Sequence, residues 1–84
     1  MNEENAAIIS KIKVGVPEYA KEIMVTISFK MKSSVTSLVF SMKDVLKMMN
    51  DINSREDIND LIGEPCQIFV DDKNTCHFKG MWIK

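Results

Sequence analysis

The segment from residue 23 to residue 32 is the strongest constraint on the fold of this chain. Apolar side chains alternate there with mostly polar ones, and the apolar set is Ile23, Val25, Ile27, Phe29 and Met31. Because successive side chains of a strand point to opposite faces, this period of two predicts a strand with one apolar face. Such a strand is typical of an antiparallel sheet that is covered on one side.

Two more strands are predicted in the first half of the chain. Residues 8–16 also alternate, and Pro17 ends this strand because proline has no backbone N–H to donate to a neighbour. Residues 35–40 form a third, less regular strand that follows a short turn. Both segments are rich in β-branched residues, which favours extended backbone.

Two helices are predicted after the third strand. Ser41 followed by Asp44 resembles a capping box, so we expect the first helix to begin there and to end at Asn53. Ser54 is the expected cap of a second short helix, and Gly63 is its expected stop. The apolar face of the first helix has helical spacing and consists of Val45, Met48, Met49 and Ile52.

The chain closes in a predicted β-hairpin. A three-residue loop with Asn74 in the left-handed region pairs Asp71 with Thr75. This register predicts the pairs Val70–Cys76, Ile68–Phe78 and Cys66–Gly80 on one face. It also points Trp82 inward, and it leaves Phe69, His77, Met81 and Ile83 on the opposite face.

Together these elements predict a single domain over residues 1–84 with an α+β fold. Its order is β-β-β-α-α-β-β: a mainly antiparallel sheet of about five strands with two helices packed on one face. The expected core consists of Ile12, Val14, Val25, Ile27, Phe29, Leu38, Val45, Met48, Met49, Ile52, Leu61, Ile68, Val70 and Phe78.

Net charge and the start of the chain bear on partners and location. The formal charge is −1, so a nucleic-acid partner is not expected. If one did bind, the contacts would come from Lys11, Lys13, Lys30 and Lys32. The start is acidic where a signal peptide needs basic residues, and no apolar run is as long as a membrane span. We therefore expect a cytoplasmic protein with no membrane partner.

Catalytic and metal-binding patterns are not found. The three glycines, at 15, 63 and 80, fit no phosphate-binding loop, and no serine lies in a nucleophile elbow. Cys66 and Cys76 are too far apart along the hairpin for a disulfide, and with His77 they lack the spacing of a zinc site. We predict no enzyme activity, no catalytic residue, no metal and no cofactor.

The second face of the closing hairpin is the feature that favours a partner. An ordinary two-layer domain leaves such a face to water, yet Phe69, Met81 and Ile83 lie there beside His77. Either another part of the chain covers this face or a partner does. Tyr19, in the loop after the first strand, is a further candidate contact residue.

Three stretches cover most of the chain: "AAIISKIKVGVPEYAKEIMVTISFKM", "SMKDVLKMMNDINSREDINDLIGEPCQIFVDD" and the closing "FKGMW". In these stretches the chain resembles a family of small uncharacterised phage and prophage proteins. The Glu-Asp-His-Gly loop of that family is absent here, and Pro17-Glu18-Tyr19-Ala20 stands in its place. The resemblance implies a phage context and no particular activity.

These observations lead to two functional hypotheses. The first is a protein-interaction module that modulates or inhibits a host protein, such as a defence component. The second is a homodimer that binds or sequesters a small ligand, with Tyr19, His77 and Trp82 as pocket residues.

Overall fold

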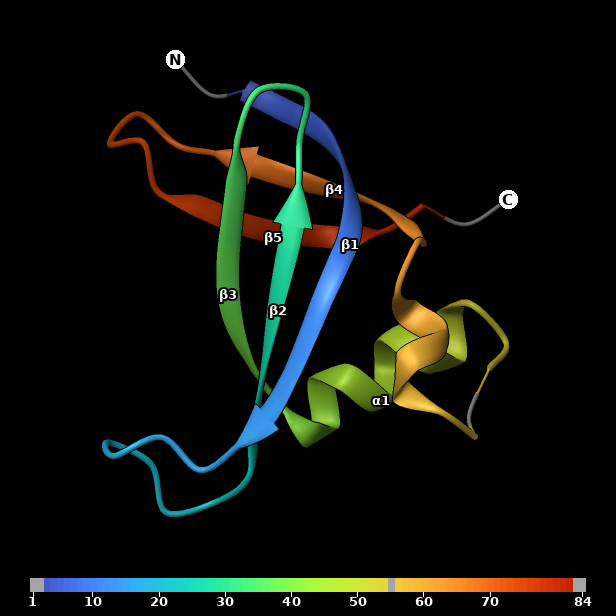
Figure 1. Cartoon of the computed structure of the whole chain (residues 1–84). Coiled ribbons are helices and arrows are strands. Elements are labelled where there is room, and N and C mark those ends of the chain that lie inside the picture. Colours follow the sequence, from blue (N-terminus) through green and yellow to red (C-terminus); the bar gives the residue numbers. More distant parts are fainter. Residues whose placement is uncertain (1–2, 55, 83–84) are drawn as a thin grey trace.

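The computed structural model of the chain describes residues 3–54 and 56–82. Its elements are β1 (Glu3–Gly15), β2 (Met24–Lys30), β3 (Val35–Ser41), α1 (Met42–Asp51), the 3-10 helix η1 (Ile58–Leu61), β4 (Pro65–Val70) and β5 (Cys76–Met81). All five strands belong to one antiparallel sheet in the order β3-β2-β1-β4-β5 (Figure 1). The predicted α+β class and the five antiparallel strands are confirmed.

The long strand β1 joins two layers of this sheet. Its first part pairs with β4, and its second part pairs with β2. Between the two parts the register shifts because Ser10 is an extra residue between Ile9 and Lys11. Such a bulge bends a strand and increases its twist. The sheet therefore curls, and β2 and β3 run crosswise to β4 and β5 (Figure 1).

The core lies inside this curl and is closed by α1, which packs against β3, η1, β2 and β5. Most of the predicted core residues are buried or partly buried there. Ile9 was not predicted; it points inward because the bulge at Ser10 reverses the alternation of β1. The prediction for Val14 is wrong: this side chain, next to the last residue of β1, is 51% exposed. Val70 is only half-buried and lies outside the core cluster.

The first predicted helix is confirmed and the second is wrong. Ser41 caps α1, and its hydroxyl oxygen accepts a hydrogen bond from the N–H of Asp44 at 3.2 Å. In the second segment the cap is Asp57, whose carboxylate accepts from the N–H of Asn59, and only the four residues of η1 follow. The hydroxyl of Ser54 donates instead to the carboxylate of Asp60. Because the cap lies three residues later than expected, the segment is too short for an α-helix before the turn at residue 63.

The closing hairpin keeps the predicted loop but not the whole predicted register. Asn74 has φ of 63°, and the N–H of Asp71 donates to the carbonyl of Thr75 at 3.1 Å, as expected. The pairs Val70–Cys76 and Ile68–Phe78 are confirmed, whereas Cys66 lies opposite Met81 and not opposite Gly80.

A register shift in β5 causes this difference. Gln67 lies opposite Gly80 and Ile68 lies opposite Phe78, so the register shifts by one residue at Lys79, which forms a second bulge. Beyond the bulge the two faces of β5 are exchanged. Met81 is therefore buried, with 8% of its surface exposed, and Trp82 is 50% exposed, which reverses the predicted orientation of both.

Within the described part of the chain, no helix combines the length and the apolar character that crossing a membrane requires.

Candidate functional site at the sheet edges

The two edges of the sheet, β3 and β5, border a groove of about 530 Å³ whose third wall is α1. We call it the edge groove. It lies where the curl of the sheet stays open, because β3 and β5 cross without pairing with each other. The lining residues are Leu38, Val39 and Phe40 of β3, Asp44, Lys47, Met48 and Asp51 of α1, and Cys76, His77, Phe78, Lys79 and Gly80 of β5.

Three phenylalanines from three strands pack beneath the edge groove. The ring centroids of Phe40 and Phe78 are 5.4 Å apart, and the ring of Phe29 lies 6.0 Å from Phe40 and 5.7 Å from Phe78. Edge-to-face and tilted pairs at these distances are favourable arrangements for aromatic rings. Phe29 is fully buried, while Phe40 and Phe78 are partly exposed and line the groove. The floor of the groove is therefore apolar and held in place by the core.

Charged groups stand along the rim of this apolar floor. Asp44, Lys47 and Asp51 follow one another at spacings of three and four residues, which places them on one side of α1. His77 and Lys79 come from the opposite wall, on β5. Both signs of charge are present, so the rim does not favour an anion or a cation as such.

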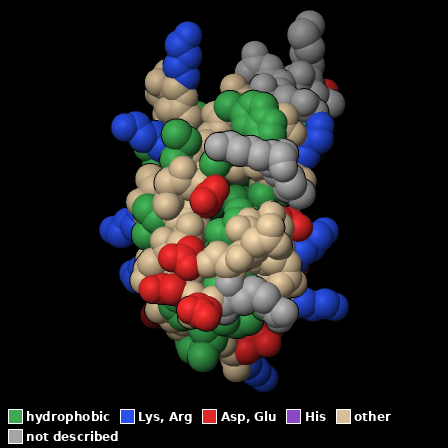
Figure 2. Space-filling model, turned by 90° about the vertical axis from the view of Figure 1, so that its right-hand side faces the viewer, with side chains coloured by type: hydrophobic (Ala, Val, Ile, Leu, Met, Phe, Trp, Pro, Cys, Tyr) green, Lys and Arg blue, Asp and Glu red, His purple; other side chains and the backbone are tan. Residues whose placement is uncertain are grey.

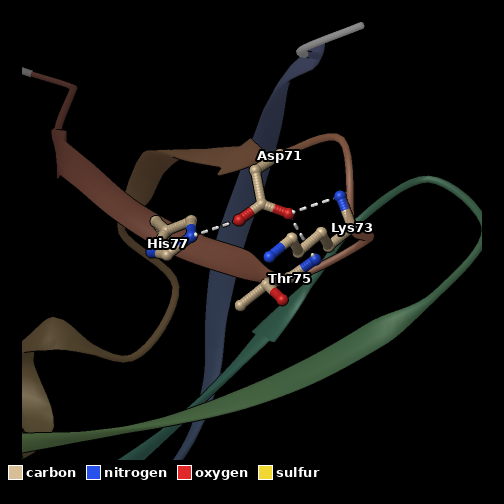
Figure 3. A network of polar contacts seen from close by, with 4 residues as sticks. All are labelled: Asp71, Lys73, Thr75 and His77. Atoms are coloured by element: carbon tan, nitrogen blue, oxygen red, sulfur yellow. Dashed lines mark hydrogen bonds and ion pairs between the residues drawn. The ribbon is translucent and has the colours of Figure 1, made fainter.

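A polar network at the tip of the β4–β5 hairpin orients His77 (Figure 3). One carboxylate oxygen of Asp71, Oδ2, accepts a hydrogen bond from Nε2 of His77 at 2.9 Å. The other, Oδ1, accepts from the backbone N–H groups of Lys73 and Thr75, each at 2.9 Å. The hydrogen bond from His77, followed by that from Thr75, holds the pKa of Asp71 below its ordinary value. The ionised carboxylate thus ties the loop to the wall of the groove.

The structure separates the five residues predicted to contact a partner. Phe69 and His77 lie opposite each other with ring centroids 6.0 Å apart, as expected. Met81 points into the core on the other face, so the predicted cluster on that face is wrong in this respect. Tyr19 is 74% exposed in the loop between β1 and β2, and Ile83 lies outside the described residues.

Sequence reasoning missed the β3 side of the groove. Leu38 and Phe40 lie on the inner face and Val39 on the outer face, yet all three line the groove because it opens at the edge of the strand. The signal was the irregular pattern of residues 35–40, with apolar side chains on both faces. That pattern is what an edge strand beside an apolar groove would carry.

Two features of the described residues bear on chemistry: the environment of the Cys66 thiol and the spacing of possible metal ligands. Cys66 is buried, its Sγ donates to the carbonyl of Ala7 at 3.6 Å, and burial raises its pKa to about 11. A thiol with a raised pKa is a poor nucleophile because the thiolate is the reactive form. Within residues 3–54 and 56–82, no three His, Cys, Asp or Glu side chains are grouped closely enough to hold a metal ion.

Acidic side chains gather on the side of the molecule away from the β3 edge. In the middle of the face shown in Figure 2 lie several acidic side chains, with basic ones along its margins. This side carries η1 (Figure 1), and Asp60 of η1 is exposed there together with Glu56 and Asp57, which precede it. This acidic surface is separate from the edge groove, whose lining carries both signs of charge.

No family model, curated protein or solved structure matches this chain. The resemblance to small phage and prophage proteins therefore stays a prediction.

Proposed function

We propose that this protein acts by binding another protein in the edge groove. The observation that carries the proposal is the apolar floor of Phe40 and Phe78, partly exposed between two strand edges and rimmed by charged side chains. Exposed apolar surface with a polar rim is a common mark of a protein-interaction site. The hairpin network of Asp71 and His77 holds one wall of this site in a defined position.

The finer part of the proposal concerns the partner and the place of action. The resemblance to phage proteins suggests a host protein whose activity is modulated or inhibited, for example a defence component. We place this action in the cytoplasm, and the two free thiols, Cys66 and Cys76, suit a reducing compartment.

A second candidate function is binding of a small ligand by a homodimer. Its support is the size of the groove, because 530 Å³ falls within the roughly 300–1,000 Å³ of small-molecule sites. His77 lines this groove as that hypothesis requires, whereas Tyr19 and Trp82 are not among the residues that line it.

Two valines of β3 provide a matched test. Val39 and Val35 both lie on the outer face of the strand and are 44% and 63% exposed, but only Val39 lines the groove. We would immobilise wild type, Val39→Glu and Val35→Glu and identify the proteins that each retains from a bacterial host lysate. A protein retained by wild type and by Val35→Glu, and lost from Val39→Glu, is the expected result.

The same experiment can contradict the proposal. If Val39→Glu retains the same proteins as wild type, the edge groove is not the binding site. If no protein is retained but native mass spectra of wild type show a bound small molecule that Val39→Glu lacks, the small-ligand function replaces it.

A further inference from the structure

The two edges that border the groove differ in how well they can accept another strand. β3 is seven residues long and carries no charge, no proline and no register shift. β5 has the bulge at Lys79, and it presents His77 and Lys79 as exposed side chains. Bulges, lysines and prolines are the usual means by which natural edge strands avoid pairing with other chains. β3, all of whose residues the structure describes, has none of them.

The backbone of β3 presents alternate hydrogen-bonding groups to the groove side. The turn before β3 is closed by a bond from the N–H of Met31 to the carbonyl of Ser34 at 2.8 Å. Hydrogen-bonded and non-bonded pairs alternate along an antiparallel ladder. Counting from that turn, Thr36, Leu38 and Phe40 bond to β2, whereas Val35, Ser37 and Val39 direct their N–H and C=O groups outward.

The hydroxyl of Ser10 supports this assignment. It donates to the backbone carbonyl of Ser28 at 3.2 Å, so that carbonyl points toward β1. Ser28 lies opposite Ser37, and the pair is therefore one that does not exchange backbone hydrogen bonds. The backbone groups of Ser37 must then point to the open edge.

An added strand would also cover the exposed part of the groove floor. A strand paired with β3 would lie about 4.8 Å from it. The β4–β5 hairpin extends past β3 on that side (Figure 1), and its inner-face residues Cys76 and Phe78 are partly exposed there. The inward side chains of the added strand would rest on these two residues. One added strand would thus both pair with the backbone of β3 and cover the exposed apolar floor of the groove.

We infer that the partner enters the edge groove as an extended segment that pairs with β3, with apolar side chains at alternate positions toward Phe78. This inference rests on the proposed function and specifies the chemistry of its partner. No particular charge is expected of the segment, since β3 carries none and the groove rim carries both signs. Recognition comes from backbone hydrogen bonds to Ser37 and Val39, at the part of β3 that borders the groove, and from the apolar contacts.

The test uses short peptides selected on wild-type protein from a displayed random library. We expect the selected peptides to alternate apolar and other residues. Their affinity should fall at least tenfold for Val39→Pro, which removes one outward N–H without breaking a bond to β2. Val39→Thr keeps the N–H and the branched shape, and it should bind like wild type. The heteronuclear NMR spectrum of each variant reports whether it is folded.

A second measurement leaves the protein unchanged. Methylation of single backbone nitrogens along a selected peptide should abolish binding to wild type at every second position, because only alternate N–H groups face β3. If methylation abolishes binding at no position, and only changes of the peptide side chains do, strand pairing is wrong.

The outcomes separate this inference from the proposed function. Binding that Val39→Glu abolishes and Val39→Pro preserves would keep the groove as the site and reject the added strand. Binding that both variants preserve would reject the groove itself. If no peptide is selected and sedimentation shows a dimer that Val39→Pro converts to monomer, the occupant is a second copy of β3 and the inferred partner is wrong.

Discussion

The two hairpins of this protein, β2–β3 and β4–β5, each form one edge of the sheet, but they differ in how regular that edge is. β2–β3 has an unbroken register from Met24–Ser41 to Lys30–Val35 and an uncharged outer strand. β4–β5 has a three-residue loop, a polar network at its tip and a bulge at Lys79. The regular hairpin leaves an edge that can accept another strand, while the irregular one has an edge that is protected.

This difference also decides which side chains reach the core. In β2 the alternation is unbroken, so Val25, Ile27 and Phe29 are all fully buried. In β5 the bulge exchanges the two faces, so Met81 becomes buried and Trp82 exposed. A single bulge thus determines which apolar side chains of that hairpin are available to a partner.

The largest expected effect concerns the phenylalanine that joins the two hairpins. Phe29 is fully buried between Phe40 and Phe78, so Phe29→Ala should lower the free energy of unfolding by about 3–5 kcal/mol. Phe69→Ala, on the outer face of β4, should cost about 1–2 kcal/mol because that side chain is already partly exposed. Urea unfolding followed by circular dichroism measures both. Equal losses of unfolding free energy would contradict the idea that Phe29 joins the two hairpins.

The next effect tests the bulge at Lys79. Met81→Ala should lower the free energy of unfolding by about 2–3 kcal/mol because it empties a buried position. Trp82→Ala should cost less than about 1 kcal/mol, since the backbone N–H of Trp82 still bonds to the carbonyl of Pro65. If the order of the two losses is reversed in urea unfolding, the register without the bulge is correct.

A smaller effect is expected at the loop of the β4–β5 hairpin. Asn74 has φ of 63°, a conformation that costs most residues about 1–2 kcal/mol. Asn74→Ala should therefore lower the thermal midpoint, whereas Asn74→Gly should leave it near that of wild type. A midpoint that is the same in both variants would mean that the loop is not closed by a left-handed residue.

The smallest expected effect is the pH dependence of the same hairpin. The lowered pKa of Asp71 means that its ionised form stabilises the folded state. This contribution is fully present above the unfolded pKa of about 3.9, and it is lost as the pH falls through the lower pKa of the folded state. The urea midpoint of wild type should therefore fall more steeply on acidification than that of Asp71→Asn.

A titration of the Asp71 carboxyl group tests whether the hydrogen bond from His77 is what lowers its pKa. His77→Ala removes the hydrogen bond that lowers the pKa most, so the pKa of Asp71, followed by NMR, should move up toward its ordinary value. Val35→Ala, on the other hairpin, serves as the control and should leave it unchanged. An unchanged pKa in His77→Ala would show that the backbone donors alone hold the carboxylate.

Much of the local structure was predictable because it depends on neighbours in the chain. The alternation of residues 23–32 predicted β2, Ser41 and Asp44 predicted the start of α1, and the Asp-Asp-Lys-Asn run predicted the loop at Asn74. Each of these signals is a short-range steric or hydrogen-bonding preference. The second helix failed for the same kind of reason, since Asp57 is a competing cap that lies only three residues after Ser54.

The candidate site was predictable only in part. His77 was expected to face a partner and does line the edge groove, but the β3 wall of Leu38, Val39 and Phe40 was not foreseen. A groove between edge strands depends on which strands are left unpaired. That is a property of the strand order β3-β2-β1-β4-β5, which brings residues far apart in sequence together.

By itself, the sequence determined the strands, the capped helix and the loop of the last hairpin, because period, cap and turn chemistry act within a few residues. Only the tertiary structure decided the bulges at Ser10 and Lys79, the burial of Ile9 and Met81, and the open edge of β3. The reason is physical: the ten residues of α1 cannot cover a flat five-stranded sheet, so the sheet buries its apolar face by curling over itself. The positions of the bulges that allow this curl depend on packing between residues that are far apart in the sequence.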